Sequence, residues 1–177
     1  MTTTINDKTT QWKTTIIVST SLQNHETSRT FVAQQHRIRF SDAVASDSFV
    51  FPQSGIAFIL INPQQLPENL VEAEVFHKIE EFVMVHRNSF LLLQAPFNGK
   101  NELDLMSVIQ YRFIGSNLRV LPVRNNTEIV NGMLTIAKAT CKPHVDTVRD
   151  RMSQARAQIL EKSPVWEMLR EMKLGNQ

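Results

Sequence analysis

The chain has 177 residues, 42% of them hydrophobic, and a formal net charge of +2 at pH 7. This hydrophobic share supports a packed core and excludes a largely disordered chain. The longest apolar run, residues 56–61, is too short to cross a membrane. Cys141 is the single cysteine, which excludes an internal disulfide and a zinc site of several thiolates, and favours a reducing compartment. Residues 1–12 are polar and Thr-rich, without the apolar segment of a secretory signal, and we expect a disordered lead-in there.

Short apolar runs recur along the chain and predict buried strands at residues 14–20, 56–61, 90–93 and 118–123. A half-exposed strand is expected at residues 37–40 and a short strand at residues 48–51. Pro52 suggests a sheet edge, and Pro122 suggests an edge or a strand end. The segments 62–89 and 97–117 are long enough for helical crossovers between parallel strands. The pattern therefore predicts an α/β fold with a mostly parallel sheet flanked by helices.

Helical spacing fills the segments between these runs. A weak helix is expected at residues 26–35, with Phe31 and Val32 facing inward. Stronger patterns follow at residues 75–86, where His86 falls on the apolar side, and at 129–137. Another follows at residues 103–113, where one side comprises Leu103, Met106, Ile109, Gln110 and Phe113. Acidic residues gather on the other side of the 75–86 helix, which predicts an acidic face there.

In folds of this class, ligands bind beyond the carboxyl ends of the parallel strands. The segments that follow the predicted strands there contain no phosphate-binding loop, no acid pair and no nucleophile with its base. The candidate carboxylates Asp42 and Asp47 have no lysine beside them in the sequence and are expected to be turn residues. We therefore predict no catalytic residue, no metal site, no cofactor and no small-molecule substrate.

The chain changes character near Pro143. We expect an α/β domain at residues 13–142 and a short helical tail at residues 143–177, with a second helix starting at Ser163 and Pro164. Two helices of this size cannot build a substantial core alone, so they are expected to pack on the main domain or on another chain. The predicted partner surface comprises Val148, Met152, Ile159, Val165, Trp166 and Leu169.

Basic side chains accompany the apolar stripe of the tail. Phosphate contacts need exposed basic side chains on a rigid scaffold. The candidates are Lys142, Arg149, Arg151 and Arg156. Because they are few, DNA binding through this chain alone should be weak and sensitive to salt. The alternative is that these residues form solvated helix faces.

Several segments resemble the vertebrate members of the family of the meiotic protein Spo-sixteen. The resemblance runs from residue 12 to residue 174, and the segments that carry it are WKTTIIVS at 12–19, SGIAF at 54–58, NSFL at 88–91, LRVLPV at 118–123, TIAK at 135–138 and SPVW at 163–166. The first strand and the SPVW segment are its most specific parts.

That family in turn resembles the non-catalytic small subunit of the XPF-type structure-specific endonucleases. The resemblance implies a catalytically inactive nuclease-like domain followed by a helix-hairpin-helix region. The residues after Pro143 are too few for a tandem module, so a degenerate helix-hairpin-helix tail is expected. The implied partner is the XPF-like shortage-in-chiasmata protein, in a heterodimer that binds branched DNA without cutting it.

The implied role is in meiotic crossover formation and chromosome synapsis, among the ZMM proteins, in the nucleus and on meiotic chromosomes. Two alternatives stay open. One is a structural adaptor that stabilises its partner without touching DNA. The other is a residual metal-dependent nuclease, which would need a carboxylate cluster that the sequence does not offer.

Overall fold

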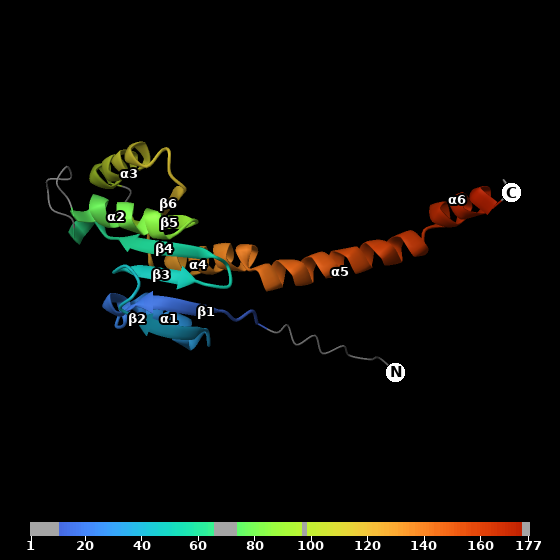
Figure 1. Ribbon diagram of the computed structural model, residues 1–177, viewed down its shortest axis with the longest axis horizontal. Coiled ribbons are helices and arrows are strands. Elements are labelled where there is room, and N and C mark those ends of the chain that lie inside the picture. The colour runs from blue at the N-terminus through green and yellow to red at the C-terminus, as the bar shows by residue number, and fades with distance from the viewer. Residues whose placement is uncertain (1–10, 66–73, 97–98, 175–177) are drawn as a thin grey trace. The chain divides into compact units, whose positions relative to one another are not determined.

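The computed structural model describes residues 11–65, 74–96 and 99–174, and the chain divides into two compact units. Residues 1–140 form the first, here called the α/β unit, and residues 141–177 form the second, here called the tail unit (Figure 1). The predicted lead-in at residues 1–12 lies almost wholly outside the described residues. No helix in the described ranges is both long and apolar enough to span a membrane.

The α/β unit alternates strands with helices along the chain. Its strands are β1 (Thr15–Ser19), β2 (Arg37–Ser41), β3 (Ser48–Phe51), β4 (Ile56–Ile61), β5 (Ser89–Gln94) and β6 (Leu118–Val123). Its helices are α1 (Glu26–Ala33), α2 (Glu74–Val85), α3 (Lys100–Arg112) and α4 (Asn126–Thr140), with short 3-10 turns η1 (Thr20–Leu22) and η2 (Pro63–Gln65).

The six strands form one sheet in the order β2-β1-β3-β4-β5-β6. Neighbouring strands are parallel except at β3, which runs antiparallel to both β1 and β4. The predicted mostly parallel, helix-flanked sheet is therefore confirmed. The edge position suggested by Pro122 is also confirmed, because β6 is the last strand. The edge suggested by Pro52 is wrong, because β3 lies inside the sheet and Pro52 belongs to the turn that follows it.

Two apolar cores cover the two faces of the sheet, because the strands alternate their side chains between faces. On one face, Phe31 of α1 and Met133 of α4 pack with Ile16, Phe58 and Leu92 from the strands. On the other face, α2 and α3 pack over the central and β6-side strands. Every residue of β4 is buried, as expected for a continuous apolar run between two helical layers.

Two inward-facing assignments on the helices are wrong. Val32 is 59% exposed although Phe31 beside it is fully buried, so α1 turns a narrower apolar stripe to the sheet than expected. Leu103 is also exposed, and Leu105 takes its place in the core under α3. In both helices the apolar residues outnumber the positions that face the sheet, and only the sheet's location decides which are covered.

The tail unit consists of two helices, α5 (Lys142–Glu161) and α6 (Pro164–Leu174). The predicted helix start at Pro164 is confirmed, and the carbonyl of Ser163 accepts the N–H groups of Trp166 at 3.0 Å and Glu167 at 3.2 Å. Proline is well placed there because the first turn of a helix needs no N–H donor from it.

Candidate functional site

The five parallel strands all point the same way, so their carboxyl ends lie along one end of the sheet. The antiparallel strand β3 begins at that same end, which is here called the rim. Ser19 ends β1, Asp42 follows β2 and Asp47 precedes β3, so residues distant in sequence come together there. This rim is where the fold class places ligands.

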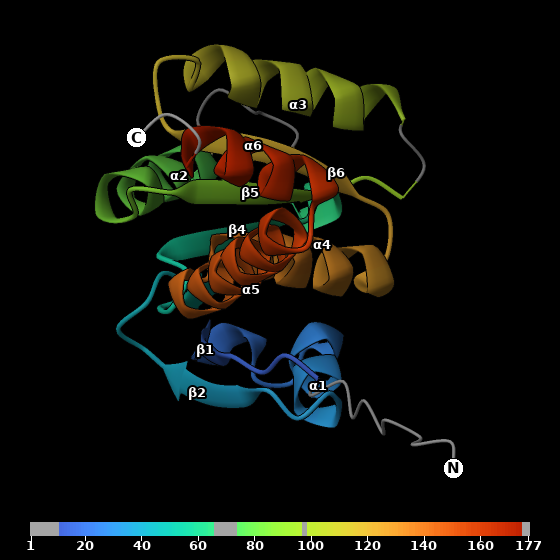
Figure 2. The same cartoon turned by 90° about the vertical axis from the view of Figure 1, so that its right-hand side faces the viewer.

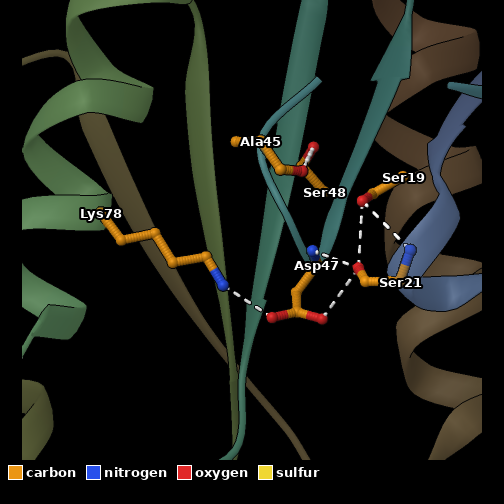
Figure 3. A network of polar contacts seen from close by, with 6 residues as sticks. All are labelled: Ser19, Ser21, Ala45, Asp47, Ser48 and Lys78. Carbon is orange, nitrogen blue, oxygen red and sulfur yellow. Dashed lines mark hydrogen bonds and ion pairs between the residues drawn. The ribbon is translucent and has the colours of Figure 1, made fainter. Parts of the chain in front are cut away.

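A polar network joins the end of β1, η1, the start of β3 and α2, and is here called the rim network: Ser19, Ser21, Asp47 and Lys78 (Figure 3). The Ser21 hydroxyl donates to Oδ1 of Asp47 at 3.2 Å, and the N–H of Asp47 donates back to Oγ of Ser21 at 2.8 Å. Oγ of Ser19 lies 3.0 Å from Oγ of Ser21. On the other side, Nζ of Lys78 lies 2.6 Å from Oδ2 of Asp47.

Asp47 holds an unusual backbone conformation, with φ at +58°. This left-handed region is costly for most residues, but aspartate tolerates it better than others. The position is fixed further by the main chain, because the carbonyl of Asp47 accepts the N–H of Leu60 at 2.8 Å. The rim network therefore ties the start of β3 to η1, β4 and α2.

The prediction that Asp42 and Asp47 are turn residues without a lysine partner is wrong for the lysine partner of Asp47. Both do lie in the turn between β2 and β3, but Lys78 reaches Asp47 from α2, 31 positions along the chain. Asp42 accepts a hydrogen bond from the hydroxyl of Thr20. The Lys78–Asp47 pair is partly exposed to solvent and is expected to add about 1 kcal/mol or less to stability.

The chemistry of the rim follows from how these carboxylates are engaged. The ammonium group of Lys78 pairs with Oδ2 of Asp47, and the hydroxyl of Ser21 donates to Oδ1 of Asp47. The hydroxyl of Thr20 donates to Oδ1 of Asp42. Within the described ranges, no group of three or more His, Cys, Asp or Glu side chains converges as a metal site would require. The arrangement is suited to holding segments together.

His36 lies in an aromatic corner of the α/β unit. Its ring contacts Trp12 and Phe31 edge-on, with each pair of ring centroids 6.0 Å apart. Its Nδ1 accepts the N–H of Thr14 at 3.3 Å. Burial, and secondly the positive charge of Lys13, lower the pKa of His36 below its ordinary value of 6.5. His36 is therefore a neutral acceptor that anchors the start of β1.

The stability of the protein is expected to fall on acidification below about pH 6.5, since a lowered folded-state pKa means that the unfolded chain takes up the proton first. His36→Asn keeps a hydrogen-bond acceptor but cannot titrate, so part of this pH dependence should disappear. Urea unfolding at several pH values between 5 and 8 (bracketing the ordinary histidine range) measures the effect.

Burial also lowers the pKa of His86. The His36→Asn variant should therefore keep a smaller dependence of its unfolding free energy on pH. His77→Asn, an exposed position on α2, is the matched control. An unchanged pH slope in His36→Asn would contradict the role given to His36.

The tail unit contains all the residues predicted to contact a partner or DNA. Val148, Met152 and Ile159 recur at helical spacing along one side of α5, and Val165, Trp166 and Leu169 do so on α6. All six are exposed, and no residue of α5 is buried. A stripe of large apolar side chains left in solvent is typical of an interaction surface.

The four predicted DNA contacts divide into two groups on α5. Lys142, Arg149 and Arg156 are spaced by seven residues, which places them about 10 Å apart along one side of the helix. Arg151 lies about 200° around the helix from Arg149, on the other flank of the apolar stripe. The structure therefore places three of the four basic residues in one row along α5 and separates Arg151 from them. Arg149 also lies 3.9 Å from Asp146, in an exposed and weak ion pair.

Comparison with known proteins agrees with this architecture. The α/β fold is similar to two solved structures from Aeropyrum pernix. "XPF from Aeropyrum pernix, complex with DNA" matches with a TM-score of 0.58 at 9% identity, covering 73% of this chain and 66% of that one. "XPF from Aeropyrum pernix" matches with a TM-score of 0.58 at 10% identity, covering 83% of this chain and 71% of that one. At these identities the likeness shows an XPF-like fold.

Sequence comparison identifies the family. A human protein described as "Protein SPO16 homolog" is 44% identical over 167 residues, which are 94% of this chain and 92% of that protein. The family model described as "Protein SPO16 homolog" matches residues 10–172, which include most of the α/β unit and most of the tail unit. The chain therefore belongs to the SPO16 homolog family.

Proposed function

We propose that this chain is the non-catalytic subunit of a meiotic XPF-like heterodimer. Its partner would be the XPF-like shortage-in-chiasmata protein, and the pair would bind branched recombination intermediates and promote crossover formation and synapsis. The site of action would be the nucleus, on meiotic chromosomes. Membership of the SPO16 homolog family and the XPF-like fold support this proposal.

The observation that carries the proposal is the unburied apolar stripe of the tail unit. Six large apolar residues on two helices stay exposed, whereas the apolar runs of β4 and β5 in the α/β unit are buried. Exposing such a stripe in water is unfavourable by roughly 25 cal/mol for each Å² of apolar surface. A protein partner that covers the stripe would remove this cost.

The engaged state of the rim carboxylates supports a non-catalytic role. Catalysis by a divalent metal needs carboxylate oxygens that are free to coordinate it. Asp47 instead pairs with Lys78, and Asp42 accepts from Thr20. Residual nuclease activity remains the less favoured alternative, and cleavage of a branched substrate by the complex with Mg²⁺ or Mn²⁺ would establish it.

DNA contact through α5 is the part of the proposal that can be tested most directly. The side of α5 that carries Lys142, Arg149 and Arg156 offers a row of charges to a phosphate backbone. For the Arg149→Ala, Arg156→Ala double variant in complex with the partner, the slope of log K against log[salt] should become smaller in magnitude by about 2. Fluorescence anisotropy with a labelled branched duplex, over a series of salt concentrations, measures this slope.

The matched control removes two exposed arginines from the α/β unit, Arg29→Ala with Arg87→Ala, and should leave the slope unchanged. If Arg149→Ala, Arg156→Ala also leaves the slope unchanged, these arginines do not contact DNA. Crosslinking of the complex on branched DNA then tests the adaptor alternative, which predicts crosslinks to the partner alone.

A further inference from the structure

Strand β2 forms one edge of the sheet, at the opposite end from β6 (Figure 2). Its inner side pairs in parallel with β1 from Arg37 to Ser41. Its outer side faces no other strand among the described residues. An open edge offers unpaired main-chain groups to any extended chain that approaches it.

The register with β1 shows which main-chain groups point outward. The N–H of Arg37 donates to the carbonyl of Thr14 at 3.0 Å, so the main-chain groups of Arg37, and by alternation those of Arg39, point toward β1. The N–H and C=O groups of Ile38 and Phe40 therefore point away from the sheet. They form a row of two donors and two acceptors, with no partner within the described part of the chain.

The side chains of β2 differ between the two faces of the sheet. Arg37 and Arg39 are exposed on one face, aligned with Thr15 and Ile17 of β1. Neither arginine forms an ion pair with the described acidic residues. Ile38 and Phe40 lie on the other face, where Ile38 packs against the core and Phe40 stays 40% exposed.

We propose that the outer edge of β2 binds an extended segment of a partner protein in which acidic and apolar residues alternate. Such a segment adds a seventh strand to the sheet, and its backbone pairs with Ile38 and Phe40. Since side chains alternate with a period of two, its acidic residues fall beside Arg37 and Arg39. Its apolar residues extend the surface formed by Ile38 and Phe40.

Charge selects this occupant over a second copy of the chain. If the β2 strands of two copies paired side by side, with each face of one sheet continuing into the same face of the other, the arginines of one copy would lie opposite those of the second. These like charges repel. The same charges attract an acidic strand. Nucleic acid would satisfy the arginines, but its backbone has no regular row of donors and acceptors to pair with the N–H and C=O groups of Ile38 and Phe40. This inference does not depend on DNA binding by the tail unit.

The test uses NMR amide shifts of the full-length chain titrated with three probes: a short peptide of alternating Glu and Val, its Lys and Val counterpart, and oligodeoxythymidine. The acidic peptide should shift the amides of Ile38 and Phe40 and slow their exchange with solvent. It should bind about tenfold or more tightly than the basic peptide, because two attractive pairs replace two repulsive ones.

Arg37→Glu with Arg39→Glu should reverse this preference, so that the basic peptide binds better. Arg87→Glu with Arg124→Glu is the matched charge change away from β2, because Arg87 precedes β5 and Arg124 follows β6 at the other end of the sheet, and it should leave the preference unaltered. The proposal is overturned if the acidic peptide does not shift Ile38 and Phe40 of the wild-type chain, or if both peptides bind equally. Shifts at this edge with oligodeoxythymidine alone would instead identify a nucleic-acid surface.

Discussion

Replacing Phe58 with alanine is expected to lower the free energy of unfolding by about 3–5 kcal/mol, the largest effect on stability that we predict for a single substitution. Phe58 lies in the middle of β4 and is fully buried. Its ring centroid lies 5.5 Å from that of Phe51, in an edge-on contact, and 5.1 Å from that of Phe90, in a stacked one. Truncation would leave a cavity between these rings, in a sheet that is held by helices on both faces and cannot collapse around it.

The control is Phe40→Ala, which removes the same side chain from an edge strand where it is 40% exposed. About 1 kcal/mol or less is expected there, because water already reaches the ring. Urea unfolding monitored by circular dichroism measures both variants at pH 7.5, above the range in which His36 contributes a pH slope. Equal losses in the two variants would show that the aromatic contacts of Phe58 do not set the stability of the α/β unit.

Replacing both Trp166 and Leu169 with alanine is expected to weaken binding of the proposed XPF-like partner by at least about 30-fold. Buried tryptophan anchors at interfaces typically contribute 2 kcal/mol or more, and a difference of that size corresponds to roughly a 30-fold change in affinity. Both side chains are 48% exposed in the chain and lie on the same side of α6, together with Val165. Because they are already exposed, the substitutions should leave the folding of the α/β unit intact.

The control for this double variant is Glu167→Ala with Glu171→Ala, which changes the opposite side of the same helix. Isothermal titration calorimetry or a pull-down with the co-expressed partner measures both variants. Partner binding that survives loss of Trp166 and Leu169 would exclude α6 from the interface. Equal weakening by the glutamate variant would mean that the helix matters but its apolar side does not.

The sequence by itself determined the features that depend on neighbouring residues. The strand at residues 56–61 has apolar side chains on both faces, so both faces must be covered by helices, and it is fully buried. The spacing of Phe76, Ile79 and Phe82 places them on one side of a helix wherever that helix packs. Proline at position 164 begins α6 because its fixed backbone angle suits a first helical turn. The segments that resemble the Spo-sixteen family also lie in the sequence itself, and the comparisons confirm that membership.

Only the tertiary structure decided the features that join distant segments. The insertion of β3 between β1 and β4 could not be read from four residues with a proline after them, because an edge strand and an interior strand share that local pattern. The contacts of Asp47 with Ser21, 26 positions away, and with Lys78, 31 positions away, depend on where the β2–β3 turn and α2 meet. Helical period likewise left open whether Val32 faces the core, since the width of the buried stripe depends on the surface that the helix meets. Local periodicity sets which residues share a face, whereas the packing of the sheet and helices decides which faces are covered and which polar groups meet.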